Sequence, residues 1–168
     1  STWFWMIRST RASLPMELAD LDAMLRSITY ENTSEGATAG DRTLTFTVTD
    51  AGGLTSAPAV STITVIPVND GPVAVADSIV TLEDSFAVID VTANDVDLDG
   101  DVLTVTEING QAVSIGGPAV AVAHGGVTLD AAGRVVFTPS MDYFGTTTFA
   151  CTINDGHGGT ATAGVIAD

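Results

Sequence analysis

The residues best suited to chemistry form one acidic run, Asn94-Asp95-Val96-Asp97-Leu98-Asp99-Gly100-Asp101. Its carboxylates occupy every second position, so in an extended chain they lie on the same side, roughly 7 Å apart. Each adjacent pair then repels by about 0.6 kcal/mol in water. No lysine or arginine occurs between Arg42 and Arg134 to relieve this repulsion. A hard divalent cation with several oxygen ligands would relieve it, so the run predicts a Ca²⁺ site.

The same run matches the first half of an EF-hand loop, Asp-x-Asp-x-Asp-Gly. The twelfth position, however, is Thr106, and Glu107 comes one place late. The flanking segments also alternate like β-strands, whereas an EF-hand needs helices. We therefore reject an EF-hand and keep the metal hypothesis for Asp97 and Asp99. The alternative is a solvated acidic turn, and for Asp101 both interpretations stay open.

The composition favours a folded all-β domain and excludes two classes of partner. The chain of 168 residues has a net charge of −16 and no lysine. We therefore expect no binding to nucleic-acid phosphates and no docking on anionic lipid. With 45% hydrophobic and only 15% charged residues, the chain does not have the composition of a disordered acidic tail. Abundant Thr, Val, Ala, Gly and Asp suit strands and tight turns.

No residue pattern supports catalysis, so we expect a protein that is not an enzyme. Cys151 is the single cysteine and lies in an alternating strand pattern, which favours a small buried side chain over a nucleophile. His124 and His157 lie in glycine-rich turns without a second ligand at metal-binding spacing. The chain contains no phosphate-binding loop, dinucleotide fingerprint or Gly-x-Ser-x-Gly motif. Without disulfides, an extracellular domain of this size would need another clamp, and metal is the usual substitute.

The apolar segment at residues 3–7 predicts neither a membrane span nor a signal peptide. It is too short to cross a bilayer, and Arg8 and Arg11 follow it. It also lacks the basic-then-apolar order and the cleavage site of a signal peptide. We expect no direct membrane insertion.

A stiff junction divides the chain into two expected domains. Residues 67–72, Pro-Val-Asn-Asp-Gly-Pro, place a turn between two prolines, so we set the boundary between residues 69 and 70. Residues 1–69 predict one short amphipathic helix over 16–30 and two strands. Residues 70–168 predict an immunoglobulin-like Greek-key β-sandwich, because short strand patterns alternate there with turn signals. The expected strands span residues 43–50, 61–66, 73–82, 86–92, 102–108, 112–115, 119–123, 127–129, 134–138, 146–154 and 160–166, with Asn109-Gly110 as a hairpin turn and Gly125-Gly126 in a loop.

An internal repeat relates the two domains. The stretch Thr43-Leu-Thr-Phe-Thr-Val-Thr-Asp50-Ala-Gly-Gly corresponds to Thr148-Phe-Ala-Cys-Thr-Ile-Asn-Asp155-Gly-His-Gly-Gly, with the two aspartates 105 residues apart. We interpret residues 1–69 as the C-terminal part of one sandwich-sized repeat and residues 70–168 as a nearly whole second one. The partial repeat lacks sheet neighbours, so we expect it to be partly disordered, or to pack on the second domain or on another copy.

Several motifs occur in a characteristic order along residues 16–168. They are the segment 21–34, Val48-Thr-Asp50-Ala-Gly-Gly, the 67–72 linker, Glu83-Asp84, the acidic run, Gly133-Arg-Val-Val-Phe137-Thr-Pro139 and Tyr143-Phe-Gly145. In this order and spacing they resemble the cadherin-like tandem domains of large secreted or cell-surface bacterial adhesins, including RTX-type ones. That resemblance implies Ca²⁺ at the junction between successive domains. Because this linker has fewer potential ligand residues than the full motif of the family, it implies one or two ions. The implied ligands are Asn69 and Asp70 of the linker, Asp95, Asp97 and Asp99 of the acidic run, Asp155 at the end of a strand, and Glu83 as an added carboxylate.

The function implied is a Ca²⁺-binding structural or adhesive repeat of an extracellular bacterial protein. Ca²⁺ would stiffen the junction and project a binding tip located elsewhere in the parent protein. The expected partners are neighbouring repeats of the same polypeptide and a cell-surface or matrix glycan or protein. The alternative is an accessory, carbohydrate-contacting β-sandwich of a secreted enzyme. Such a module needs exposed aromatic side chains, and most aromatic residues of the second domain occupy core-like positions.

Overall fold

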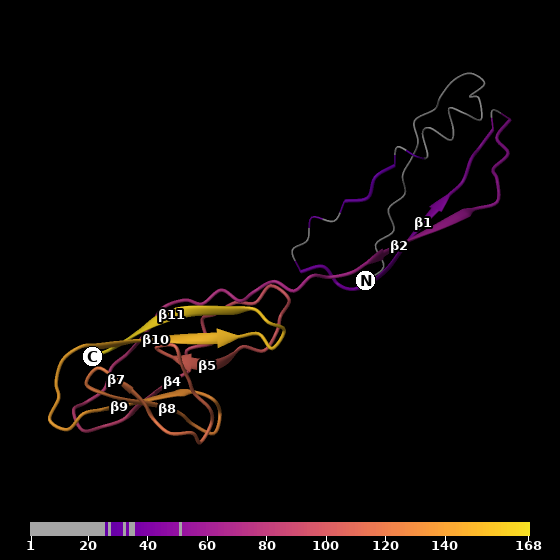
Figure 1. Ribbon diagram of the computed structural model, residues 1–168. Coiled ribbons are helices and arrows are strands. Elements are labelled where there is room, and N and C mark those ends of the chain that lie inside the picture. Colours follow the sequence, from indigo (N-terminus) through magenta and orange to yellow (C-terminus); the bar gives the residue numbers. More distant parts are fainter. Residues whose placement is uncertain (1–25, 27, 32, 34–35, 51) are drawn as a thin grey trace. The chain divides into compact units, whose positions relative to one another are not determined.

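The computed structural model describes residues 26, 28–31, 33, 36–50 and 52–168 (Figure 1). Contacts divide the chain into two units, residues 1–33 and 34–168. The helix expected over residues 16–30 falls almost entirely outside the described residues; of those described, Arg26 is helical and residues 28–30 are not. The domain boundary that we set between residues 69 and 70 stays a prediction.

The first strands of the second unit form a hairpin. β1 (Gly40–Phe46) pairs antiparallel with β2 (Ala59–Val65), in a register that runs from Gly40 opposite Val65 to Phe46 opposite Ala59. β1 alternates half-buried and exposed residues, as its sequence pattern predicts. The ladder ends at Phe46, where the partner strand continues into Pro58, which has no amide to donate. Pairing resumes in a shifted register at the Thr49–Thr55 bridge, beside a turn in which the Asp50 carboxylate accepts the Leu54 amide at 2.9 Å.

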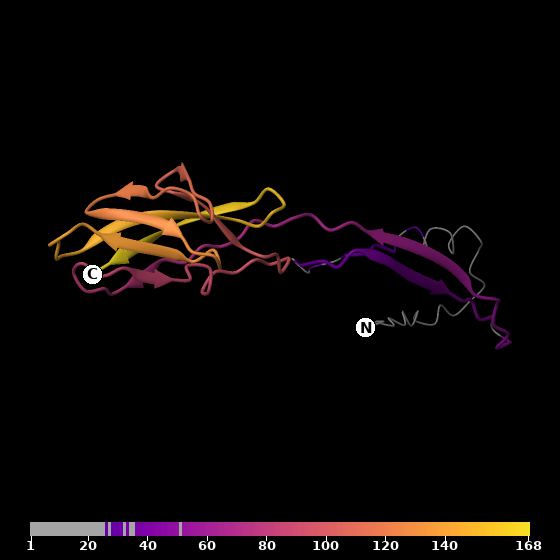
Figure 2. The same ribbon diagram turned by 90° about the horizontal axis from the view of Figure 1, so that it is seen from below.

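Residues 77–167 form a sandwich of two sheets, which lie as separate layers in Figure 2. The five-stranded sheet has the order β3-β11-β10-β5-β6, and the four-stranded sheet has the order β4-β9-β8-β7. Neighbouring strands are antiparallel except for β3 and β11, which are parallel. This confirms the predicted all-β, immunoglobulin-like architecture. The strands are β3 (Asp77–Ile79), β4 (Ala87–Ile89), β5 (Thr104–Ile108), β6 (Gln111–Ala112), β7 (Val120–Val122), β8 (Gly125–Leu129), β9 (Val135–Pro139), β10 (Thr147–Asn154) and β11 (Thr160–Ala167).

The core lies between the two sheets and follows the alternation of the strands. β10 buries every second residue, among them Phe149, Cys151 and Ile153, the positions that the repeat marked as inward. The rings of Phe137 and Phe149, one from each sheet, have centroids 6.0 Å apart. The expectation that most aromatic residues of this domain occupy core positions is wrong, because Phe86 and Phe144 are 67% and 85% exposed. The remaining core is aliphatic: Val91, Val105, Ile108, Val120, Val127, Leu129, Val135, Val165 and Ala167.

The expected loop at Gly125-Gly126 is a strand. Gly125 starts β8 and pairs with Val122 on one side and Pro139 on the other. A Cβ atom at Gly125 would come within 2.7 Å of the Phe137 ring, so only glycine permits this close approach. The Gly125-Gly126 pair does mark a position where the backbone needs glycine, but the prediction that this pair forms a loop is wrong.

Two strand ends position the residues of interest. β10 ends at Asn154, directly before Asp155, and β5 starts opposite it, with Thr104 paired to Asn154. The acidic run precedes β5, so it meets the loop after β10 at one end of the sandwich. Val73 and Val96 exchange two backbone hydrogen bonds, of 2.8 and 3.1 Å, and these join the segment after the linker to the acidic run.

Candidate metal centre

Three carboxylates meet at this end of the sandwich. Asp97, Asp101 and Asp155 each offer an oxygen atom, and these three atoms lie within 4.8 Å of one another. At that separation two carboxylates repel by about 0.9 kcal/mol in water and by several times more where water is excluded. Among the described residues, this is the cluster whose geometry could hold a metal ion.

Asp97 is held in place by its own loop. Its Oδ1 atom accepts the backbone amides of Asp99, at 2.9 Å, and Asp101, at 3.2 Å. These bonds curl the chain, so Asp97 and Asp101 face the same side although they are four positions apart. The other oxygen, Oδ2, is buried and has no hydrogen-bond partner. A buried carboxylate oxygen without a donor is costly, and a cation would satisfy it.

Asp155 is buried, with 3% of its surface exposed, and its position is fixed by several donors. Oδ1 accepts the backbone amides of His157 and Gly159, at 2.7 and 2.9 Å, and Oδ2 accepts the side-chain amide of Asn69 at 2.8 Å. The hydrogen bond from Asn69 contributes most to lowering the pKa of Asp155, partly opposed by burial, with further backbone bonds adding to the decrease. Asp155 is therefore an ionised carboxylate in a preformed position.

Gly159 makes this arrangement possible. A Cβ atom at Gly159 would collide with the Asp155 carboxylate and would lie 2.8 Å from the Cα atom of Gly71 in the linker. The glycine therefore lets the Asp155 loop and the linker approach each other closely. The corresponding turn of the first copy, Asp50-Ala-Gly-Gly, is one residue shorter, and a Cβ atom at its Gly53 would meet nothing within 4 Å, so the first copy does not show this close approach.

The linker residues contact the cluster, although their side chains are not all part of it. Asn69 bonds Asp155, as described, and the Asp70 backbone amide donates to Asp99 Oδ2 at 2.7 Å. Asp99 is thereby a bridge between the linker and the acidic run. These two bonds connect the linker to Asp155 of the cluster and to Asp99 of the acidic run, whose carboxylate is not one of the three.

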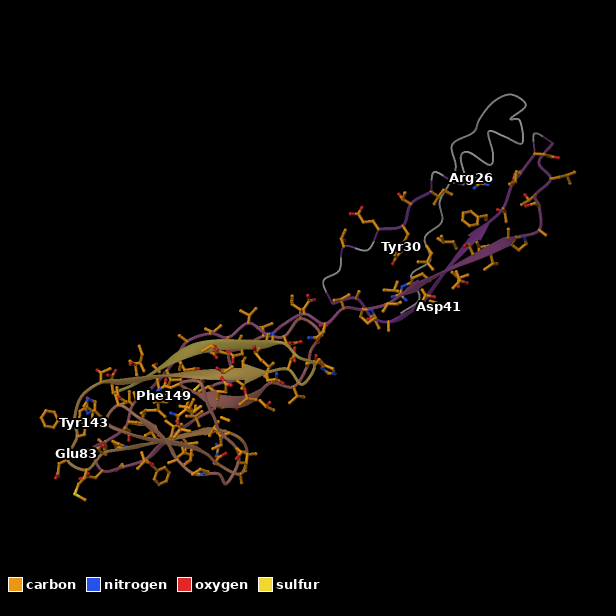
Figure 3. The ribbon with its side chains drawn as sticks, viewed as in Figure 1. Arg26, Tyr30, Asp41, Glu83, Tyr143 and Phe149 are labelled. Carbon is orange, nitrogen blue, oxygen red and sulfur yellow. The ribbon has the colours of Figure 1, made fainter. Side chains whose placement is uncertain are left out.

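Two predicted ligands lie elsewhere. Asp95 Oδ1 accepts the Val75 amide at 2.7 Å, and Asp95 also contributes to raising the pKa of Asp77, after the larger effect of burial. Glu83 lies at the other end of the sandwich, beside Tyr143 (Figure 3). The two ends are separated by about 23 Å, the length of β10 at 3.3 Å per residue.

Asp101 belongs to the cluster, although sequence reasoning left it open. In an extended chain a residue four positions after Asp97 lies too far away to share an ion. The signal that could have placed it is the Asp-x-Asp-Gly-Asp pattern itself, since an aspartate side chain often bonds the amide two residues on and curls the loop. In the structure, Asp101 Oδ2 also lies 2.9 Å from Nδ1 of His157.

Comparison with known proteins gives a family for the sandwich. No curated protein matches the chain, and among the described residues no helix is long and apolar enough to cross a membrane. Several solved structures resemble part of the chain, and this chain spans only about a quarter or less of the length of the two described next. One is a nucleoside hydrolase-related hypothetical protein from Saccharophagus degradans associated with carbohydrate metabolism, with 18% identity over 60% of this chain and 26% of that one, at a TM-score of 0.41. The other is an endo-fucoidan hydrolase from glycoside hydrolase family 107, with 16% identity over 79% of this chain and 19% of that one, at a TM-score of 0.35.

The family model of the bacterial Ig domain matches residues 69–167, a range that contains both sheets, the carboxylate cluster and Asn69 of the linker. The match covers more than half of the chain. The chain belongs to the bacterial Ig domain family.

Proposed function

We propose that this bacterial Ig domain is a structural repeat of an extracellular adhesive protein and that Ca²⁺ bound at Asp97, Asp101 and Asp155 stiffens its junction with the preceding repeat. Bacterial Ig domains are typically non-catalytic structural modules and commonly occur in extracellular or surface proteins. The cadherin-like, Ca²⁺-dependent and adhesive parts of the function go beyond the family and are our proposal.

The observation that carries the metal proposal is the buried, unpartnered Oδ2 atom of Asp97. An acidic surface turn would direct its carboxylates to water, whereas this oxygen lies away from water beside two further carboxylates. Ca²⁺ binds carboxylate oxygens at 2.3–2.6 Å, so ligands on opposite sides of one ion are about 5 Å apart. The separation of up to 4.8 Å within the cluster fits that requirement.

The residues present fit Ca²⁺ better than the other common metals. The donors are oxygen atoms of three carboxylates, and hard oxygen ligands of this kind select Ca²⁺ or Mg²⁺ over Zn²⁺ or copper. The three carboxylates supply only part of the six to eight ligands that Ca²⁺ takes, which leaves positions for water or for a neighbouring repeat. When bound, the ion would supply positive charge that removes the repulsion within the cluster.

The stiffening follows from the linker contacts. Asn69 and Asp70 bond Asp155 and Asp99, so the linker is fastened to residues on both sides of the cluster. Without a cation, repulsion between Asp97, Asp101 and Asp155 opposes the approach of these two loops. Neutralising that charge would hold the loops together and would restrict the linker with them.

Backbone ¹⁵N relaxation of the full chain, with Ca²⁺ and with chelator, tests this proposal. We expect the order parameters of Asn69, Asp70 and Gly71 to rise when Ca²⁺ is added, while those of the Asn109-Gly110 turn stay the same. Asp97→Asn should abolish the change. Equal linker order parameters in Ca²⁺ and chelator, with Ca²⁺ shown to be bound, would refute stiffening, and absence of Ca²⁺ binding would refute the metal site.

A further inference from the structure

The end of the sandwich opposite the carboxylate cluster carries exposed apolar side chains around a hollow. Leu82 is 76% exposed, Met141 84% and Phe144 85%. Two loops present them, the one between β3 and β4 and the one between β9 and β10, and the Asp142 amide joins these loops by donating to Asp84 Oδ1 at 3.0 Å. We call Leu82, Met141, Phe144 and the hollow between the two loops the apolar pole.

The hollow has a volume of about 180 Å³, and both apolar and acidic residues line it. Phe137, Pro139 and Ala167 line it together with Leu82 and Phe144, and Glu83 and Asp168 add carboxylates. Figure 3 shows Glu83 and Tyr143 together at this end of the sandwich. Large apolar side chains clustered on a surface, rather than scattered singly, mark an interaction site.

The loops of the apolar pole have constrained backbones. Asp84 and Asp142 have positive φ angles of 60° and 57°, and Gly145 has a φ of 134°. The Tyr143 hydroxyl donates to the Thr146 carbonyl at 3.0 Å, and the Tyr143 ring stacks on His124 with centroids 4.0 Å apart. These contacts restrain the short loop that carries the exposed Phe144. Little conformational entropy would therefore be lost when Phe144 binds a partner.

Charge decides which kind of partner fits. Residues 69–168 contain fourteen acidic residues and one basic residue, Arg134. Arg134 pairs with Asp130 at 2.7 Å, so it does not neutralise Glu83 or Asp168. A second copy of this chain, with a net charge of −16, would bring more negative charge to a surface that is already acidic.

We propose that the apolar pole binds a basic amphipathic segment of another protein, with an apolar side chain in the hollow and lysine or arginine beside Glu83 and Asp168. The apolar side chain would contact Phe144 and Leu82, as an anchor residue does in a recognition pocket. The cationic groups would meet the acidic rim, which orients the segment and speeds its association.

Titration of the ¹⁵N-labelled full chain with three short synthetic peptides tests this proposal. One peptide alternates leucine and lysine, one alternates serine and lysine, and one alternates leucine and glutamate. We expect the leucine-lysine peptide to shift the amides of residues 81–86 and 140–146. The other two peptides should bind at least tenfold more weakly, because the serine-lysine peptide has no apolar side chain for the hollow and the leucine-glutamate peptide has no positive charge for the acidic residues.

Matched variants separate this site from non-specific attraction to an acidic protein. Phe144→Ser should weaken binding of the leucine-lysine peptide by about tenfold or more, as for a central anchor. Glu83→Gln should weaken it by about two- to fivefold, as for an exposed charge pair. Ile115→Ser and Glu107→Gln make the same types of change elsewhere on the sandwich and should leave binding unchanged.

Several results would overturn the proposal. Equal binding of the serine-lysine peptide, or unchanged binding by Phe144→Ser, would show attraction by charge alone. Shifts confined to another face would place the site elsewhere. A neutral glucan oligosaccharide that shifts residues 81–86 and 140–146, where the leucine-lysine peptide does not, would make the apolar pole a carbohydrate platform instead.

Discussion

Replacing Asp97 with asparagine should change stability in opposite directions with and without Ca²⁺. Asparagine has the same shape as aspartate, and its Oδ1 can still accept the Asp99 and Asp101 amides. The substitution therefore keeps the hydrogen bonds that shape the loop and changes only the buried Oδ2 position of residue 97. There, a neutral amide that can donate a hydrogen bond replaces the unpartnered oxygen of a carboxylate that clusters with Asp101 and Asp155.

In chelator the variant should be more stable than the wild type. Asp97→Asn removes two like-charge pairs at separations of up to 4.8 Å, each worth about 0.9 kcal/mol in water and more at lower effective dielectric. We therefore expect the free energy of unfolding to rise by about 1–2 kcal/mol. For a domain of this size, each kcal/mol raises the melting temperature by roughly 4–8 °C.

With Ca²⁺ the order should reverse. A ligand that binds only the folded state adds about 2.7 kcal/mol at 100 times its Kd. The variant has lost one carboxylate ligand and should gain little of this stabilisation. The wild type should then be more stable than the variant by about 1 kcal/mol, which is the stabilisation by bound Ca²⁺ minus the charge repulsion that the variant no longer has.

Thermal unfolding of the full chain by far-UV circular dichroism, in chelator and in excess Ca²⁺, measures both differences. Asp142→Asn is the matched control, because it removes one negative charge from an exposed position far from the cluster and asparagine tolerates its positive φ angle. Its stability should follow the wild type in both buffers. A variant at Asp97 that is destabilised equally with and without Ca²⁺ would refute the electrostatic reasoning.

Three further predictions concern the sandwich itself. Ile153→Ala, at a side chain 1% exposed, should lower the free energy of unfolding by about 2–5 kcal/mol in urea titrations, whereas Val102→Ala, at a side chain 82% exposed, should change it by less than about 0.5 kcal/mol. Burial raises the pKa of the Cys151 thiol to about 12, so a thiol reagent at pH 8 should label it only through unfolding, and a labelling rate independent of urea would contradict its burial. Arg134 lowers the pKa of Asp130 chiefly through its side-chain hydrogen bond, so Arg134→Ala should raise that pKa in an NMR carboxyl titration. Because a depressed aspartate pKa stabilises the fold above the unfolded value of about 3.9 and loses this effect as pH falls, the variant should differ from wild type above that pH and converge with it in acid.

The strands could be predicted because their pattern is local. Alternation in β10 identified the buried faces of Phe149, Cys151 and Ile153, and the Asn109-Gly110 pair identified the turn between β5 and β6. The failures occurred where a distant contact overrides the local signal. Gly125 continues a strand because the Phe137 ring occupies the space that a side chain would need.

The candidate site could be predicted only in part, for a similar reason. Asp97 was proposed from the alternating carboxylates of the acidic run and Asp155 from the cadherin-like resemblance, and the structure brings both to one end of the sandwich. Glu83 was included although its strand carries it to the other end, and a sequence without known strand order does not show this. Asp101 was left open because the curl of its loop depends on hydrogen bonds to Asp97 Oδ1, whereas an extended chain was assumed.

Addition of Ca²⁺ to the ¹⁵N-labelled full chain tests the central claim most directly. We expect saturable shifts of the amides of residues 97–101 and 155–159, which flank the three carboxylates, together with those of residues 69–71. The amides of residues 82–85, around Glu83, should not move. Shifts at Glu83 with none at Asp97, Asp101 and Asp155, or no saturable shift at all, would contradict a Ca²⁺ site at this end of the sandwich.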